Sequence, residues 1–283
     1  MLGRFRRGCS RACPHFPAGI NRLAYVAAIL IDIDGVLSVS SEPIPGATGA
    51  VRRLREAGHR LRFLTNNTTC PRARLTELLR SKGFDIGEKE LQTAPRAAAR
   101  ALAGRRVLAL TMSAIVEDLN GIELVGESAD AVLLGGADET EETGRVFSHM
   151  NLARAFAELE AGAELFCLHR NPWWQTKHGP LLDSGAYVAG LEYAAGMHAT
   201  VLGKPSSSFF AAALEALDSD PGQALMVGDD LASDIRGAQL HGMRTVLVRT
   251  GKFRPDVYER SGIRPTVLLS SIADLPEWLA TAR

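Results

Sequence analysis

The chain has 283 residues, 46% of them hydrophobic, and its 32 basic and 32 acidic residues give a formal net charge of zero with a pI near 7.1. Such a chain can form one large domain or two smaller ones, but it offers neither an overall basic field for nucleic acid nor a polybasic cluster for anionic lipid. No apolar stretch reaches the ~18 residues that span a bilayer, so we expect no membrane association and a cytoplasmic location. The balanced charge leads us to expect a small ligand and no nucleic-acid partner.

The first 31 residues differ from the rest, because they contain five arginines and no acid and so leave the remainder with a net charge of −5. They are poor in serine and lack the apolar core of a signal peptide, which argues against a targeting segment. We interpret residues 1–24 as a disordered basic tail. The four cysteines (Cys9, Cys13, Cys70 and Cys167) are too few and too scattered for a disulfide framework, which fits a reducing compartment.

Apolar segments and amphipathic helices alternate after this tail. The pattern predicts strands at 26–34 and 59–67 and helices at 46–58 and 71–83, each helix ending at a glycine. Residues 91–199 contain strands and helices of their own and are therefore predicted to be a second α/β domain rather than a long loop.

The same alternation returns in the last third of the chain. It predicts helices at 205–217, 232–242 and 271–282 and strands at 224–230 and 244–251. Repeated βα units indicate a Rossmann-like, doubly wound parallel sheet with helices on both faces. The core is then formed by residues 25–90 and 200–283, and the inserted domain at 91–199 lies over it as a cap.

Polar side chains follow four of the predicted core strands. They are Asp32 and Asp34, then Thr65 and Asn66, then Lys204, and finally Asp229, Asp230 and Asp234. Ligands of parallel sheets bind beyond the carboxyl ends of the strands, so we expect these groups to meet at one edge.

The gathered groups suit phosphoryl transfer. Carboxylates this close would raise each other's pKa unless a cation lay between them, and oxygen ligands at this density suit Mg²⁺. With the charge countered by the metal and by Lys204, Asp32 could attack phosphorus and form an aspartyl-phosphate. Asp34 could protonate the leaving group and then activate water, while the Thr65 hydroxyl and nearby backbone N–H groups could hold the phosphoryl oxygens.

The stretches DIDGVL, LTNN, GKP and GDDLASDI resemble, in order and spacing, the four motifs of the haloacid dehalogenase superfamily of phosphohydrolases. The IPGA stretch, the TNN form of the second motif and the large insert resemble subclass IIA, the NagD-like enzymes. Residues 203–253 look closest to the branch that holds phospholysine phosphohistidine inorganic pyrophosphate phosphatase. The resemblance covers about residues 25–275 and implies a cap of the C2 type.

Carried over position by position, the resemblance implies that Asp32 is the nucleophile. It implies that Mg²⁺ is bound by Asp32, the backbone carbonyl of Asp34, and Asp229, with Asp234 supporting the metal site. Thr65 and Asn66 would bind the phosphoryl group, and Lys204 would pair with it and with Asp32. The position of Asp230 varies within this motif. The caps of the subgroup often form dimers, so a homodimer is an expected partner state beside the small phosphorylated substrate.

Substrate choice is expected to depend on residues 168–187, a polar and aromatic segment that follows a strand, precedes a helix and is interpreted as a binding loop. Arg170 or Lys177 could meet a second anionic group, and Trp173 or Trp174 could stack on a ring. His169 is a further candidate contact. The same pattern also fits a solvated loop whose tryptophans anchor in the cap interior.

Taken together, the sequence predicts a Mg²⁺-dependent phosphatase that acts on a small phosphate ester, phosphoramidate or pyrophosphate. A sugar, nucleotide or pyridoxal phosphate phosphatase of the same subgroup is an alternative. A receiver-type signalling domain also uses an acidic cluster with Thr and Lys, but Asp34 and the inserted cap argue against it. A catalytically silent binding or scaffold protein is the third alternative, since a fold alone does not prove activity.

Overall fold

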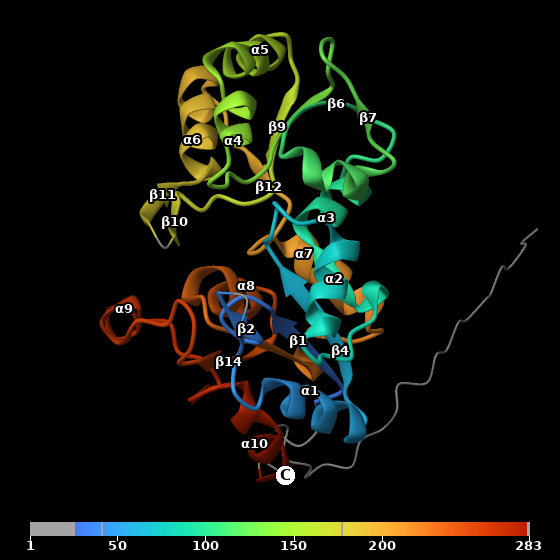
Figure 1. Ribbon diagram of the computed structural model, residues 1–283, viewed down its shortest axis with the longest axis vertical. Coiled ribbons are helices and arrows are strands. Elements are labelled where there is room, and N and C mark those ends of the chain that lie inside the picture. The colour runs from blue at the N-terminus through green and yellow to red at the C-terminus, as the bar shows by residue number, and fades with distance from the viewer. Residues whose placement is uncertain (1–25, 41, 177, 282–283) are drawn as a thin grey trace, which may run out of the picture.

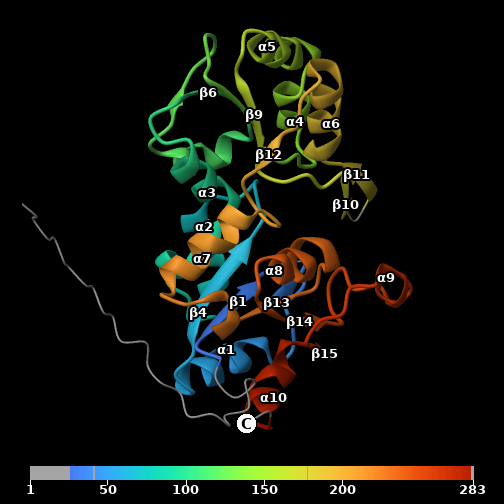
Figure 2. The same cartoon turned by 180° about the vertical axis from the view of Figure 1, so that it is seen from behind.

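The computed structural model describes residues 26–40, 42–176 and 178–281. The predicted basic tail and Lys177 therefore lie outside the described residues. Two α/β units follow one another along the long axis, and the described part of the chain begins and ends in the lower unit (Figures 1 and 2). None of the helices in the described part of the chain combines the length and apolarity that crossing a bilayer requires.

The lower unit is built on a six-stranded sheet in the order β15-β14-β13-β1-β4-β5, and every neighbouring pair in it is parallel. Its strands are β1 (Ala28–Asp32), β4 (Arg60–Thr65), β5 (Leu91–Thr93), β13 (Ala224–Gly228), β14 (Arg244–Val248) and β15 (Val267–Leu269). All five residues of β1 are buried, as expected for a central strand that is covered on both faces. This sheet confirms the predicted doubly wound core.

Alternate residues of β1 enter two separate apolar clusters. Ile29 and Ile31 pack with α1, α2 and α10, while Ala28 and Leu30 pack with α7 and α8 on the opposite face. The helices of this unit are α1 (Ala47–Glu56), α2 (Arg72–Ser81), α7 (Ser207–Ala216), α8 (Gly237–Leu240), α9 (Pro255–Ser261) and α10 (Leu275–Thr281). Short helices η1 (Glu88–Glu90), η3 (Pro221–Gln223), η4 (Leu231–Arg236) and η5 (Ile272–Asp274) join them, and η4 is a π-helix.

The upper unit, which we call the cap, is a five-stranded parallel sheet in the order β12-β9-β8-β6-β7. Its strands are β6 (Arg106–Leu110), β7 (Glu123–Leu124), β8 (Ala131–Leu134), β9 (Glu164–Cys167) and β12 (Thr200–Val201). One face packs on α5 (His149–Glu160) and α6 (Ser184–Ala195), with α4 (Glu141–Val146) beside them. The other face packs on α3 (Ala94–Ala101) and the short helix η2 (Ser113–Leu119).

Sheet membership moves both expected domain boundaries by a few residues. β5 pairs with β4 of the core sheet, although residues 91–93 were predicted to open the cap. β12 pairs with β9 of the cap sheet, although residue 200 was predicted to reopen the core. Both shifts arise because a short strand at a crossover can join either sheet without any change in its own hydrophobic pattern.

Residues 168–187 contain a β-hairpin where a loop was predicted. Strands β10 (Trp173–Thr176) and β11 (Gly179–Leu182) pair antiparallel, with Trp173 opposite Leu182 and Trp174 opposite Leu181. These cross-strand pairs of an aromatic with an aliphatic side chain stabilise the two strands against each other. Both views show the hairpin projecting from the lower side of the cap toward the core (Figures 1 and 2). A second, shorter hairpin follows β1 and consists of β2 (Ser38–Val39) and β3 (Glu42–Pro43).

Candidate active site

The central strands of the core bring the predicted site residues to one edge. β1 lies between β4 and β13, and all three run in the same direction, so their carboxyl ends meet. Asp32 is the last residue of β1, Thr65 the last of β4, and Asp229 directly follows β13. Lys204 reaches this edge from the chain that returns from the cap after β12.

Lys204 lies between two carboxylates. Its ammonium Nζ donates to Asp32 Oδ1 at 2.6 Å and to Asp234 Oδ1 at 2.7 Å, and all three residues are buried. Burial alone would lower the pKa of Lys204, but the Asp234 and Asp32 carboxylates outweigh burial and raise it. The lysine is therefore a fixed positive charge at the base of the site.

Asp32, Asp229 and Asp234 form a buried acidic cluster in which each residue offers an oxygen and all these oxygens lie within 4.8 Å of one another. Burial raises the pKa of all three carboxyls, and their mutual repulsion adds to the effect at Asp229 and Asp234. The positive charges of Lys204 and Lys252 lower the pKa of Asp32, and that of Lys252 lowers the pKa of Asp229, but burial outweighs them and the pKa of both carboxyls stays raised. The cluster therefore has the charge of a site for a further cation.

Asp229 supplies the observation that a metal would explain. Its Oδ2 accepts the backbone N–H of Lys252 at 2.6 Å, while its buried Oδ1 has no hydrogen-bond partner among the residues that the structure describes. A buried carboxylate oxygen without a partner is costly. Mg²⁺ prefers such hard oxygen ligands and retains several of its waters, so the residues present fit this ion, and Asp32, Asp229 and Asp234 are the carboxylates that would hold it.

Two glycines allow the Asp229 carboxylate to approach the neighbouring backbone. A Cβ built on Gly35 or on Gly251 would overlap the Asp229 carboxylate, so neither position can carry a side chain without displacing it. Gly35 also has φ +90°, a conformation that other residues rarely adopt. The Thr250 hydroxyl donates a hydrogen bond to the Gly35 carbonyl, and this bond joins the loop after β14 to the loop after β1.

Asp34 occupies a different environment from Asp32. It is exposed, whereas Asp32 is 5% exposed, and its Oδ2 accepts a long hydrogen bond of 3.3 Å from the Thr65 hydroxyl. Thr65 Oγ1 also accepts the backbone N–H of Asn67 at 2.9 Å. The exposed carboxyl of Asp34, beside the buried one of Asp32, is suited to an acid or base that exchanges protons with the leaving group and with water.

The side chain of Asn66 binds the backbone of Lys204. Its Nδ2 donates to the backbone carbonyl of Lys204 at 2.9 Å, and its Oδ1 accepts the backbone N–H of Lys204 at 2.8 Å. Both ends of the amide are therefore occupied. Asn66 therefore fixes the backbone that carries the lysine.

Asp230 lies outside the acidic cluster. Its Oδ1 caps η4 by accepting the backbone N–H groups of Ala232 at 2.9 Å and Ser233 at 3.0 Å, and its Oδ2 is 3.2 Å from Lys252 Nζ. Although burial raises its pKa, Lys252 and these N–H groups outweigh burial and hold the pKa below the ordinary value. Lys252, which follows the carboxyl end of β14, is a further residue of this edge that was not predicted, although the strand-end rule that finds the acids also finds it.

The predicted substrate contacts of the cap separate into three kinds. His169 is buried at 3% exposure, and the Arg170 guanidinium is paired with Glu192 of α6 at 2.6 Å. Trp173 on the hairpin is 54% exposed, and Trp174 is partly buried. Trp173 is therefore the described member of this set that is most open to a ligand.

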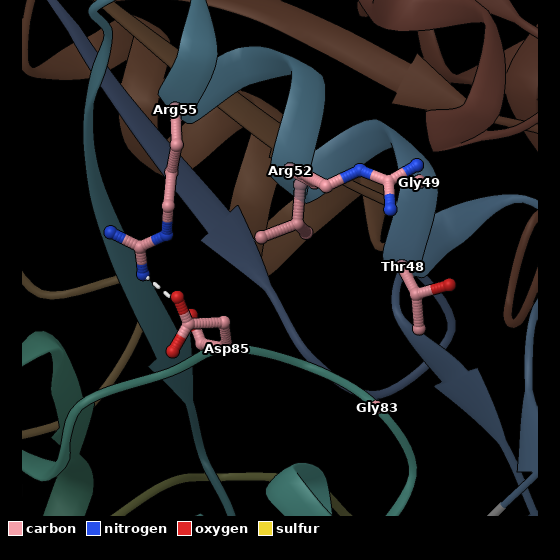
Figure 3. Close-up of a pocket in the computed structure, with 7 residues that line it drawn as sticks. Thr48, Gly49, Arg52, Arg55, Gly83 and Asp85 are labelled. Carbon is pink, nitrogen blue, oxygen red and sulfur yellow. Dashed lines mark hydrogen bonds between the residues drawn. The ribbon is translucent and has the colours of Figure 1, made fainter.

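A hollow of about 260 Å³ lies elsewhere on the core, between α1 and the chain that follows α2 (Figure 3). The guanidinium of Arg55 at its edge is held by the Glu90 carboxylate at 2.7 and 2.8 Å and by the Asp85 carbonyl at 2.8 Å. None of its lining residues belongs to the acidic cluster, so it is separate from the site described above.

Two family models match this chain. The model of the haloacid dehalogenase-like hydrolase family matches residues 29–124, and a related HAD-hydrolase-like model matches residues 201–275. These two regions contain all the core site residues.

Two curated relatives illustrate the likeness in sequence. Phospholysine phosphohistidine inorganic pyrophosphate phosphatase of Xenopus laevis is 41% identical over 81% of this chain and 86% of its own. Haloacid dehalogenase-like hydrolase domain-containing protein 2 of Homo sapiens is 37% identical over 86% of this chain and 92% of its own.

Solved structures show the same likeness. The p-nitrophenyl phosphatase from Archaeoglobus fulgidus has a TM-score of 0.83 at 28% identity and covers 90% of this chain and 99% of its own. The glycerol phosphate phosphatase from Mycobacterium tuberculosis in complex with magnesium has a TM-score of 0.77 at 29% identity and covers 90% and 77%. NagD from E. coli K-12, at 24% identity, covers 88% and 98% with a TM-score of 0.79 and shares the fold.

Proposed function

This chain is a phosphatase that belongs to the haloacid dehalogenase-like hydrolase family, and we propose that it uses Mg²⁺ and an aspartyl-phosphate on Asp32 to hydrolyse small phosphorylated compounds. The observation that carries the proposal is the charge arrangement at the end of β1. Lys204 neutralises part of a cluster of three buried acids, and the Asp229 Oδ1 has no hydrogen-bond partner within the described part of the chain. That arrangement is costly in itself and becomes favourable when a metal and a phosphate are bound.

In the first step a carboxylate oxygen of Asp32 forms a bond to phosphorus while the bond from phosphorus to the leaving group breaks. Lys204 holds Asp32 through Oδ1 at 2.6 Å and supplies positive charge to the approaching phosphoryl oxygens. Asp34 gives its proton to the departing oxygen or nitrogen. A bound Mg²⁺ would stabilise negative charge on the phosphoryl oxygens.

In the second step water attacks phosphorus of the aspartyl-phosphate. Asp34, now ionised, accepts a proton from this water, the bond between phosphorus and Asp32 breaks, and inorganic phosphate leaves. Thr65 lies within hydrogen-bond reach of Asp34 and is placed to orient this carboxyl or a phosphoryl oxygen. The products restore both carboxyls to their starting states, so the cycle needs no other reactant than water.

For the substrate class we propose phosphoramidates and pyrophosphate, because relatives at 36–41% identity are phospholysine phosphohistidine inorganic pyrophosphate phosphatases. The exposed Trp173 on the cap hairpin offers an aromatic face on which a planar group such as an imidazole could stack.

The test is phosphate release from pyrophosphate, phospholysine, phosphohistidine, pyridoxal phosphate, nucleotides and sugar phosphates, each with Mg²⁺ and with EDTA. We expect metal-dependent release that is fastest for pyrophosphate and the P–N compounds. Preference for pyridoxal, nucleotide or sugar phosphates would overturn the substrate class and leave the phosphatase mechanism standing. Release that is equally fast in EDTA would overturn the role of the metal.

A further inference from the structure

Two buried side chains connect the cap directly to the phosphate-binding loop of the core. His169 follows the cap strand β9, Thr68 follows the core strand β4, and each is 3% exposed. The His169 Nε2 lies 3.3 Å from the Thr68 hydroxyl oxygen. Gly136, which follows β8, closes one side, because a Cβ there would overlap the Thr68 hydroxyl and approach His169 Nε2. The contact is thus enclosed by three separate parts of the chain.

The hydrogen bonds around His169 determine which ring nitrogen carries the proton. Nδ1 accepts the backbone N–H of Asn171 at 3.3 Å, while the Asp183 Oδ2 is 4.0 Å away, too far for a hydrogen bond. Nδ1 is therefore the unprotonated nitrogen, and Nε2 carries the hydrogen and donates it to Thr68. Burial lowers the pKa of His169 more than the Asp183 charge raises it, which keeps the ring neutral.

The contact lies next to the groups that hold the phosphoryl site together. Thr68 is two residues past Asn66, whose amide binds both backbone polar groups of Lys204. The linker that carries Lys204 is tied in turn to the end of β9, because the Gly203 N–H donates to the Leu168 carbonyl at 3.0 Å. These hydrogen bonds, joined by the short backbone stretches 66–68 and 203–204, connect the cap to the lysine. Figures 1 and 2 show the chain after β4 rising to the base of the cap at this place.

We propose that the His169–Thr68 hydrogen bond is the link through which the cap positions the phosphate-binding loop and Lys204. His169 is then a positioning residue and not the substrate contact that its place in the cap predicted. This inference rests on the proposed function, since it concerns phosphoryl transfer at Asp32. A displacement of about 1 Å in such a positioning element can cost about 100-fold in rate.

Matched variants separate the hydrogen bond from simple packing. In His169→Gln the amide nitrogen reaches about as far as Nε2 and can still donate to Thr68. In His169→Asn the side chain ends near the place of Nδ1 and cannot. Thr68→Val removes the hydroxyl at constant shape, while Thr68→Ser retains it. The Asn variant of His169 and the Val variant of Thr68 form a double-mutant cycle.

Two readouts are needed, and only one depends on catalysis. The first is steady-state hydrolysis of p-nitrophenyl phosphate with Mg²⁺, and the second is hydrogen exchange of the backbone amides of residues 66–69 without substrate. We expect His169→Asn and Thr68→Val to lower kcat by about 10- to 100-fold, with KM changed far less, and to exchange faster in this loop. His169→Gln and Thr68→Ser should keep most of kcat, and the double variant should be no worse than either single one.

The inference is overturned if His169→Asn and His169→Gln lose the same activity and the same thermal stability, because the role is then packing alone. It is also overturned if His169→Asn and Thr68→Val stay within twofold of the wild type in both readouts. If His169→Asn does not fold, the two Thr68 variants decide the question. A wild type that hydrolyses no phosphate ester would defeat the proposed function, whereas the exchange comparison would still test the link.

Discussion

Replacing Asp229 by asparagine should stabilise the metal-free protein and abolish its response to Mg²⁺. The Asp229 Oδ1 is buried without a partner among the described residues, beside Asp32 and Asp234, and burial together with these acids raises its pKa well above the ordinary value. An asparagine retains an oxygen for the Lys252 N–H. It places a neutral N–H donor near two carboxylates where a third carboxylate stood.

The magnitude follows from the cost of a buried polar group without a partner, about 1–3 kcal/mol and more for a charged one. We therefore expect Asp229→Asn to raise the free energy of unfolding by about 1–3 kcal/mol at pH 8 in EDTA. For chains of this size each kcal/mol shifts the melting temperature by about 2–4 °C, so the rise should be several degrees.

The pH dependence has a defined sign. A carboxyl whose pKa is raised in the folded state binds more protons there than in the unfolded chain, so stability falls as the pH rises from about 4 through the folded pKa, which is about 7 for Asp234. The wild type in EDTA should therefore melt at a lower temperature at pH 8 than at pH 5, and Asp229→Asn should show a smaller drop. Mg²⁺ binds the ionised cluster and should reverse the drop in the wild type, by about 2.7 kcal/mol at a concentration of 100 Kd.

Thermal unfolding followed by circular dichroism, in EDTA and across a Mg²⁺ titration, measures both effects. Asp230→Asn is the matched control, because the pKa of Asp230 is held low by Lys252 and two backbone N–H groups. Its charge is favourable, so this variant should lose stability, by less than about 1 kcal/mol. A loss of stability in Asp229→Asn at pH 8 in EDTA, or a Mg²⁺ shift as large as that of the wild type, would refute the reasoning.

Three further predictions concern the same site. Asp32→Asn should abolish phosphate release, and its circular dichroism spectrum and melting temperature should show an intact fold; substantial residual release would remove Asp32 as the nucleophile. Lys204→Met should lower the free energy of unfolding in urea by about 3–5 kcal/mol, because it leaves two buried carboxylates unpaired, and should lower kcat; a change confined to KM would make the lysine peripheral. Gly35→Ala should eliminate the Mg²⁺-dependent rise in melting temperature, since its methyl group overlaps the Asp229 carboxylate, and an unchanged rise would show that the loop adapts.

The fold could be predicted because its signals are local. The apolar run at β1 and the βα alternation specify a parallel sheet, and Ser206 caps α7 where the sequence offered a serine. The hairpin β10–β11 was missed because polar and aromatic residues between a strand and a helix fit a loop equally well. The short strands β5 and β12 were placed in the wrong units because their partner sheets depend on the crossover and not on their own residues.

The site residues likewise fall into those that local patterns predict and those that depend on contacts between distant parts of the chain. Strand-end residues could be found because parallel strands bring their carboxyl ends together wherever they lie in the sequence. The partner of the Asn66 side chain could not be predicted, since it is a backbone group 138 residues away, and Thr68 meets His169 across 101 residues. Such contacts depend on where the cap sits, and no periodicity in the sequence encodes that placement.

The distribution of charge explains why one edge of the sheet carries both the chemistry and the instability. Lys204 satisfies one oxygen of Asp32 and one of Asp234 and so stabilises the nucleophile and its neighbour, whereas the Oδ1 of Asp229 has no hydrogen-bond partner among the residues described. Replacing Asp229 by a neutral residue would remove its repulsion with Asp32 and Asp234, but it would also remove the carboxylate oxygen that a metal needs. Instability of the empty site and affinity for Mg²⁺ are therefore two consequences of the same unpaired oxygen, and a variant that improves one should lose the other.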